Sequence, residues 1–279
     1  MRTLQQIIKA RETRDGDGVN IRRIAGSHYN AVLDPFLMLD EINSDASADY
    51  IGGFPEHPHR GMETITFMKA GRMRHRDHMG NEGVIGPGDV QWMTAGKGVL
   101  HSEMPEQESG LLHGFQIWLN LPADEKMKPA AYREINVENI PRQTLEDGGV
   151  VSVVAGDVTV NRKQTLKGLL PALATKPVMM DLSLAACESV SLGFNSDFPA
   201  LVYVSGGELV NQGGLTQGHM GVYSEGDELM LEAGKEGAVV LILSGKPIKE
   251  PIVQYGPFVM NTRAQIDQAI NDFRLGRLV

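Results

Sequence analysis

The sequence predicts an all-β fold that contains two copies of one β unit. Short runs rich in apolar and β-branched residues recur along the chain, at residues 63–68, 149–154, 200–204 and 238–243. Turns that contain glycine separate these runs, at residues 70–71, 86–88, 205–207 and 225–226. Short strands with turn signals at this spacing are typical of a barrel or a sandwich.

An internal repeat also supports the predicted fold. Residues 87–97 (PGDVQWMTAGK) match residues 225–235 (EGDELMLEAGK) at a constant offset of 138 (226 minus 88). Both copies carry Gly-Asp at the first turn and Ala-Gly-Lys at the second. Two copies of one β unit, each covering about half of the chain, explain the match. The joint is expected between residues 136 and 149, where a proline, an aspartate and two glycines cluster.

The clearest helix signal lies at the C-terminal end. Thr262 and Gln265 have the spacing of a capping box, and Gly276 is a suitable stop. Apolar residues between them recur at helical spacing: Ile266, Ala269, Ile270 and Phe273. We therefore expect one amphipathic helix over residues 262–275, packed on a barrel.

Composition excludes some classes of function. The chain is 42% hydrophobic and 22% charged, as in an ordinary globular protein, and its net charge of −9 argues against direct nucleic-acid binding. Cys187 is the single cysteine, so no disulfide can form within the chain, which fits a reducing compartment. Residues 1–10 hold no long apolar stretch, and no run has the length of a membrane span. A cytoplasmic protein without a membrane partner is expected.

Two histidine motifs carry the candidate chemistry. His57-Pro-His59 and His101-Ser-Glu103 each place two metal-binding side chains two residues apart. Residues i and i+2 of a strand share a face, so each pair can enter a barrel interior together. If the two strands are neighbours, three imidazoles and one carboxylate converge. This donor set suits a first-row transition metal with coordination positions left for O2 or substrate.

Glu63 is a rival for the carboxylate position. It lies four residues after His59, although a structural ion pair with Arg60 or another cation would also explain it. Glu103 is preferred because its spacing from His101 puts both side chains on one face.

The repeat provides an internal control for the four candidate ligands. The second copy keeps the turns but has other residues at the corresponding positions, which are Val239 for His101, Leu241 for Glu103 and, near offset 136, Gly193 and Asn195 for His57 and His59. The shared scaffold therefore does not require histidine at these places. His75 and His78 lie among charged residues before Gly80, which favours a solvated hairpin over a metal site.

Five segments strongly resemble the pirin family of the cupin superfamily. They are residues 33–41 (LDPFLMLDE), 54–61 (FPEHPHRG), 91–105 (QWMTAGKGVLHSEMP), 256–262 (GPFVMNT) and 274–277 (RLGR), and the resemblance covers essentially the whole chain. It implies two double-stranded β-helix (jelly-roll) cupin barrels face to face. Residues 1–138 would form a metal-binding cupin, and residues 139–279 a cupin without metal ligands plus the C-terminal helix.

The resemblance also implies a ligand set and a metal. Carried over by position, the pirin ligands fall on His57, His59, His101 and Glu103. The general cupin pattern would instead favour Glu63 as the carboxylate ligand, and it would place a proline near Gly96, which this sequence lacks. Pirins share that departure from the general pattern, so the pirin assignment is followed. One divalent metal per chain is implied, with Fe2+ expected and Ni, Co, Mn, Cu or Zn as alternatives.

Two functions from different classes follow from the resemblance. Several pirin-like proteins are quercetin 2,3-dioxygenases, which open the flavonol heterocycle with O2 and release carbon monoxide. Glu103 would then be the catalytic base as well as a ligand, and the partners would be O2 and a small planar aromatic substrate. The alternative is a non-enzymatic, metal-containing regulator that acts on transcription through protein partners. A metal-free cupin that binds a small molecule is a third hypothesis.

Overall fold

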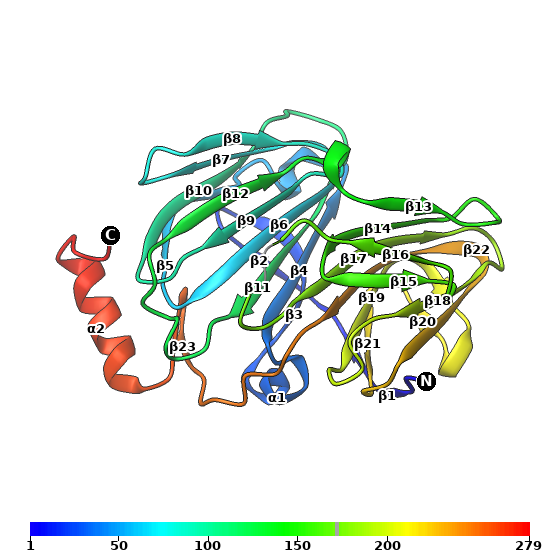
Figure 1. Cartoon of the computed structure of the whole chain (residues 1–279). Helices are drawn as coiled ribbons and strands as arrows, with labels where there is room; N and C mark the ends of the chain where they lie inside the picture. Colours follow the sequence, from blue (N-terminus) through cyan, green and yellow to red (C-terminus); the bar gives the residue numbers. More distant parts are fainter. Residues whose placement is uncertain (171–172) are drawn as a thin grey trace. The chain divides into compact units, whose positions relative to one another are not determined.

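The computed structural model describes residues 1–170 and 173–279, and strands dominate both of its compact units (Figure 1). The N-terminal unit comprises Arg11–Val137 and Ile248–Val279, and the C-terminal unit comprises Met1–Ala10 and Glu138–Pro247. The predicted all-β fold is confirmed. Among the helices of the described residues, none has both the length and the apolar character that a membrane span requires.

The N-terminal unit consists of two antiparallel sheets and a C-terminal extension. The larger sheet has the order β12-β9-β6-β11-β4-β3-β2, and the smaller has the order β5-β10-β7-β8. The strands are β2 (Arg11–Asp15), β3 (Val19–Ala25), β4 (Phe36–Ser44), β5 (Phe54–His59), β6 (Met62–Ala70), β7 (Met73–Asp77), β8 (Glu82–Ile85), β9 (Val90–Thr94), β10 (Val99–Pro105), β11 (Leu112–Asn120) and β12 (Ala131–Ile135). Three short helices, η1 (Ser27–Tyr29), α1 (Asn30–Leu33) and η2 (Ser47–Asp49), connect strands, and η3 (Val137–Asn139) follows β12.

The C-terminal unit repeats this arrangement. Its main strand order is β1-β21-β19-β22-β17-β14-β13, and β15, β16, β18 and β20 pair beside this path. The elements are β1 (Leu4–Lys9), β13 (Arg142–Thr144), β14 (Val150–Ala155), β15 (Asp157–Val160), β16 (Gln164–Lys167), β17 (Val178–Leu184), β18 (Ser189–Gly193), β19 (Ala200–Leu209), η4 (Asn211–Gly213), β20 (Leu215–Thr216), β21 (His219–Tyr223) and β22 (Glu228–Ser244).

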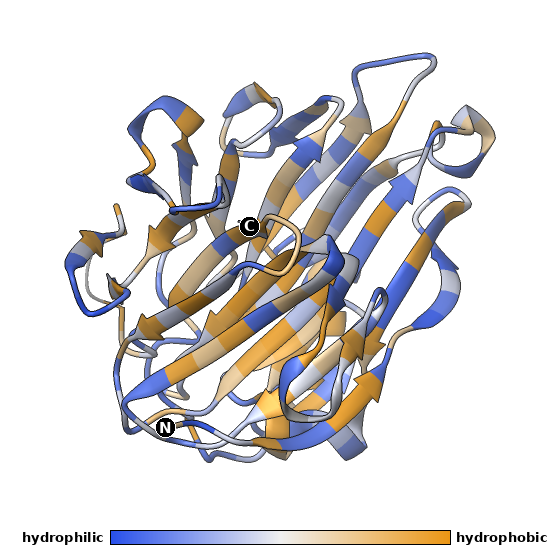
Figure 2. Cartoon of the chain, turned by 90° about the vertical axis from the view of Figure 1, so that its right-hand side faces the viewer, coloured by the Kyte–Doolittle hydropathy of each residue, from blue (hydrophilic) through white to orange (hydrophobic). Residues whose placement is uncertain are grey.

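An apolar core fills the C-terminal unit. Strand residues alternate between buried and partly exposed positions, as in β18, where Val190 and Leu192 are buried. Figure 2 shows this alternation as orange and blue bands along the strands. Valine and leucine suit such pleated, half-buried positions. Burial of these side chains supplies the main driving force for folding of the unit.

The chain passes from one unit to the other between residues 137 and 138, next to the predicted boundary, and each unit also includes a terminal segment from the other half of the chain. β1 pairs with β21, so the first ten residues belong to the C-terminal unit. Residues 248–279 belong to the N-terminal unit, where they form β23 (Val253–Tyr255), β24 (Phe258–Met260) and α2 (Arg263–Arg274). A linear division misses both segments, because strand pairing and apolar packing do not follow sequence order.

Helix α2 starts and ends close to the predicted positions. Thr262 is its N-cap, and both hydrogen bonds of the capping box with Gln265 are present. Ile266 and Ala269 are buried in a cluster that also contains Leu100 of β10. Phe273 is 43% exposed, although its spacing predicted an inward position. In Figure 1 the helix lies beside the smaller sheet of the N-terminal unit.

An ion pair joins α2 to the strand that carries the first histidine motif. Arg60 directly follows β5, is 4% exposed and lies 2.8 Å from Asp272 of α2. Its guanidinium also donates to the carbonyl oxygens of Lys97 and Leu278. The C-terminal extension therefore braces the end of β5.

The sequence repeat at offset 138 matched strands that are not equivalent. It placed β9 on the first part of β22, residues 228–232. By pairing, β9 corresponds to β21, since β9 lies between β6 and β12 as β21 lies between β19 and β1. The first part of β22 pairs with β18, as β10 pairs with β5. Gly-Asp and Ala-Gly-Lys recur because they suit many turns, so they do not fix strand equivalence.

Strand order places apolar residues where the N-terminal unit has histidines. In the pair of β18 with β22, Val190 faces Leu231 and Leu192 faces Leu229. All four side chains are at most 1% exposed and belong to the apolar core. The corresponding region of the C-terminal unit is therefore closed by packing.

Candidate functional site

Pairing of β5 with β10 brings the two histidine motifs together. His101 faces His57 across the antiparallel pair, and Val99 faces His59. His57 and His59 are two residues apart on β5, so they share a face with each other and with His101. A register irregularity follows between His101 and Glu103, after which Glu103 faces Phe54.

The three imidazoles form a tight cluster. One ring nitrogen from each of His57, His59 and His101 lies within 4.8 Å of the others. Nε2 of His57 is 3.0 Å from Nε2 of His59. Two imidazole nitrogens bound at right angles to one metal, each at about 2.1 Å, would be about 3.0 Å apart. The spacing therefore fits two ligands of one ion.

His57 and His101 each have a ring nitrogen that can bind a metal. Nδ1 of His57 lies 2.8 Å from the carbonyl oxygen of Pro55, to which it can donate, so Nε2 keeps its lone pair. Nε2 of His101 is buried and has no hydrogen-bond partner among the described residues. A buried nitrogen without a partner is costly in a protein interior, and a bound cation would satisfy it.

Burial also keeps two of the imidazoles neutral. It is the main cause that lowers the pKa of His59 well below its usual value, and the nearby His57 lowers it further. The pKa of His101 is lowered in the same way, by burial first and then by the neighbouring histidines. Neutral imidazoles are the form that binds metals.

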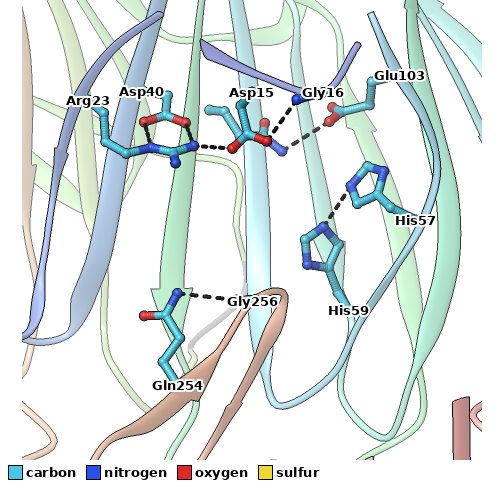
Figure 3. Close-up of polar contacts among 10 residues, drawn as sticks. Asp15, Gly16, Arg23, Asp40, His57, His59, Glu103, Gln254 and Gly256 are labelled. Atoms are coloured by element: carbon cyan, nitrogen blue, oxygen red, sulfur yellow. Dashed lines mark hydrogen bonds and ion pairs between the residues drawn. The ribbon is translucent and has the colours of Figure 1, made fainter. Parts of the chain in front are cut away.

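Glu103 lies in the same cavity as His57 and His59, outside the cluster of ring nitrogens (Figure 3). It is 4% exposed. Thr66 Oγ1 donates to Oε1 of Glu103 at 2.5 Å, and Gln116 Nε2 donates to Oε2 at 3.1 Å. Each oxygen retains a lone pair, so the carboxylate is held in place but can still accept a proton or a metal.

Glu63 has other partners. Its carboxylate accepts hydrogen bonds from Trp92 Nε1 at 3.1 Å and from Thr94 Oγ1 at 2.7 Å, and Lys128 Nζ lies 3.3 Å away. Trp92 and Thr94 are on β9, which pairs with β6. The side chain is thus held in an ion pair of the larger sheet, and the cation is Lys128 instead of Arg60.

His75 is a residue of the site that the sequence did not reveal. It is 1% exposed on β7, although its neighbours Arg74 and Arg76 point to solvent and pair with Glu82. Nδ1 of His75 lies 3.4 Å from Nδ1 of His101. The strand alternation of buried Met73 and His75 with the two arginines was the available signal. The prediction that this hairpin is solvated is therefore correct for the two arginines and wrong for His75, which is buried.

A cavity of about 520 Å3 adjoins the histidines. Small-molecule sites typically have about 300–1,000 Å3. Its apolar walls include Met38, Phe54, Pro55, Trp118 and Pro257. Its polar residues include Asp15, Arg23, Asp40, His57, His59 and Glu103. The ring of Trp118 packs edge-on against His59, with the ring centres 5.3 Å apart.

A buried lysine fixes the backbone that follows β5. Lys126 is 1% exposed and donates three hydrogen bonds, to the carbonyl oxygens of Gly61 (2.8 Å) and Val259 (3.0 Å) and to Oδ1 of Asn120 (2.7 Å). Gly61 has φ +84°, and a Cβ there would lie 2.1 Å from the Val259 carbonyl oxygen. Glycine and lysine together allow β24 to approach β5 closely.

Lys126→Met is expected to lower the free energy of unfolding by about 3 kcal/mol at pH 7.5, since three buried acceptors lose their donor. Burial lowers the pKa of Lys126 from 10.5 to about 8, so the unfolded chain binds more protons between these values. The stability of the wild type relative to the variant should therefore rise from pH 8 to pH 10.5. Urea unfolding at both pH values measures this. The exposed Lys97 provides the control, and a Lys126→Met loss no larger than that of Lys97→Met would contradict the assignment.

Comparisons with known proteins cover almost the whole chain. The family model described as Pirin matches residues 18–119, and the one described as Pirin C-terminal cupin domain matches residues 179–279. A Vibrio cholerae protein, named provisionally as a quercetin 2,3-dioxygenase, is 46% identical over 276 residues, which are 99% of this chain and 97% of that protein. Human Pirin is 36% identical over 274 residues, which are 96% of this chain and 90% of that protein.

A solved structure shares the fold throughout. It is a quercetin 2,3-dioxygenase from Acinetobacter baumannii, with 34% identity and a TM-score of 0.89. The match covers 100% of this chain and 98% of that one. The two predicted cupin domains are therefore confirmed.

Proposed function

The chain belongs to the pirin family, and we propose on this premise that it is a metal-dependent dioxygenase that cleaves quercetin or a related flavonol with O2. The three histidines and Glu103 would bind one divalent transition metal, with Fe2+ expected. The observation that carries the proposal is the cluster of His57, His59 and His101 within 4.8 Å, beside a cavity of about 520 Å3. Imidazole and carboxylate donors suit such a metal.

The residues of the cavity have separate tasks in this reaction. The metal, when bound, supplies Lewis-acid and redox chemistry toward the flavonol and O2. Glu103 takes the proton of the flavonol enol on a carboxylate oxygen, while Thr66 and Gln116 hold that carboxylate in position. Met38, Phe54 and Trp118 stack against the planar rings and exclude water. The flavonol and one O2 yield the ring-opened ester and one carbon monoxide.

Aerobic incubation of the iron-loaded protein with quercetin tests the proposal. The visible absorbance of quercetin should fall in a metal-dependent manner, with one carbon monoxide released for each quercetin consumed. The protein after removal of its metal is the control. If iron binds and quercetin stays intact at micromolar protein, the dioxygenase proposal fails and the regulatory alternative is favoured.

His75 is expected to orient His101 toward the metal. Nε2 of His75 lies 3.8 Å from a carboxylate oxygen of Asp77, and its Nδ1 faces Nδ1 of His101. The negative charge of Asp77 favours a proton on Nε2 of His75, and Nδ1 of His75 can then accept a hydrogen bond from Nδ1 of His101. Nε2 of His101 is left with its lone pair.

His75→Phe should raise the dissociation constant for the metal about 10- to 100-fold, because the hydrogen bond to His101 is lost. The ring at this position stacks on Tyr132 at 4.9 Å, and phenylalanine keeps that contact. Competition with a chromogenic chelator measures the constant, and the melting temperature of the metal-free protein checks the fold. Equal metal affinity in the variant and the wild type would show that His75 only fills space.

A further inference from the structure

A network of three charged residues forms part of the wall of the cavity beside the histidines (Figure 3). Arg23 donates two hydrogen bonds to Asp40, from Nε at 2.8 Å and from Nη2 at 2.6 Å. Nη2 also donates to Asp15, and the other oxygen of Asp15 accepts from the backbone N–H of Gly16 at 2.7 Å. We call Asp15, Arg23 and Asp40 the polar subsite.

The proposed reaction does not use these residues, and burying the charged side chain of Asp40 is costly. The side chain of Asp40 is only 5% exposed, and burial raises its pKa to about 6 although Arg23 opposes this. Desolvation of an ion pair often exceeds the attraction it gains, so stability alone is a weak reason for such a network. Its position in a cavity that also holds the candidate metal ligands suggests a role in binding.

The subsite still has hydrogen-bonding capacity that faces the cavity. The side chain of Asp15 is 48% exposed and that of Arg23 is 28% exposed. Each oxygen of Asp15 has one protein donor, so lone pairs remain. Nη1 of Arg23 has no protein acceptor in residues 1–170 and 173–279. The subsite can therefore accept hydrogen bonds through Asp15 and donate one through Arg23.

The charge of the subsite selects the chemical class of its ligand. Two carboxylates and one guanidinium carry a formal charge of −1, which disfavours carboxylate, sulfate or phosphate groups. Neutral hydroxyl groups would donate to Asp15 and could also accept from Arg23. The apolar walls of the same cavity, including Phe54 and Trp118, fit a flat aromatic body.

We propose that Asp15, Arg23 and Asp40 bind the vicinal hydroxyl groups of a catechol ring, and that they select polyphenols with this ring over those without it. Asp15 makes the direct contact, and Asp40 holds Arg23 in position. The proposal rests on the proposed function, because it assumes that the other end of the flavonol meets the metal.

Two flavonols that differ only in this ring test the proposal. Quercetin has two vicinal hydroxyls on its side ring, and galangin has none. Calorimetric titration of zinc-loaded protein without O2 avoids turnover. Quercetin should bind the wild type about 10-fold more tightly than galangin. Asp15→Asn should remove most of this preference and leave galangin binding unchanged, whereas Asp45→Asn, at an exposed surface position, should change neither. Equal affinities in the wild type, or equal weakening of both ligands by Asp15→Asn, would overturn the proposal.

A second measurement does not depend on flavonols. 4-Methylcatechol added to the metal-free protein should shift the amide resonance of Gly16, and Asp15→Asn should abolish the shift. If quercetin is not cleaved but this shift occurs, the proposed function fails and the subsite stands. If quercetin is cleaved but Gly16 does not respond and the two flavonols bind equally, the subsite fails and the proposed function stands.

Discussion

Replacing His59 with alanine is expected to weaken Fe2+ binding at least about 1,000-fold, which corresponds to about 4 kcal/mol. The histidine is 2% exposed, and its Nε2 lies 3.0 Å from that of His57, so its loss removes one of three clustered ligands. Quercetin cleavage should fall to the background of metal-free protein. Elemental analysis after dialysis against a chelator, together with chelator competition, measures the loss.

His28→Ala is the matched control for this prediction. His28 is an exposed histidine on η1, and its removal should leave metal content and turnover unchanged. The metal-free form of His59→Ala should keep its fold by circular dichroism. Metal retention in His59→Ala equal to that of the wild type would exclude the histidine cluster as the metal centre.

Glu103→Gln is expected to lower kcat for quercetin at least about 100-fold, which is the usual contribution of a general base. Glutamine has nearly the same shape and can still accept the hydrogen bond from Thr66, but it cannot take a proton from the substrate. Metal content should stay near one ion per chain, since three imidazoles remain. Turnover under saturating quercetin and O2 measures the effect.

Glu63→Gln tests which of the two carboxylates, Glu63 or Glu103, belongs to the metal site. Because Glu63 is paired with Lys128 and hydrogen-bonded to Trp92 and Thr94, its substitution should lower stability and leave metal content and kcat close to wild type. If Glu103→Gln binds metal normally and keeps full turnover, the base role is wrong. If Glu63→Gln loses the metal in a folded protein, the carboxylate ligand was assigned to the wrong residue.

Local rules predicted the parts of this protein that depend on local geometry. The spacing of two residues in the first motif is enough to place His57 and His59 on one face, and the structure has them there. The capping box at Thr262 fixed the start of α2, since both of its hydrogen bonds are made within four residues. These features need no knowledge of distant parts of the chain.

Features that depend on distant partners were missed. Nothing near Leu4 in the sequence indicates that it pairs with Tyr223, and nothing near Asp272 indicates that it meets Arg60. His75 was misjudged because charged neighbours dominate its surroundings in sequence, while its own side chain follows the opposite face of the strand. The sequence repeat matched β9 to the wrong strand of the C-terminal unit. Turns constrain only a few residues, whereas the equivalence of strands is set by pairing across a sheet.

The exchange of terminal segments makes the order of synthesis matter. β1 is made long before its partner β21, which begins at His219, so a long loop must close before the pair forms. The histidines of the N-terminal unit are synthesised early, but Arg60 can pair with Asp272 and Leu278 only after residues 248–279 have been made. The C-terminal unit has all of its segments once residue 247 has been made, whereas the N-terminal unit, most of which is made earlier, is complete only after residues 248–279. A gene cut between residues 138 and 139 would therefore separate each unit from one of its segments and yield two incomplete proteins.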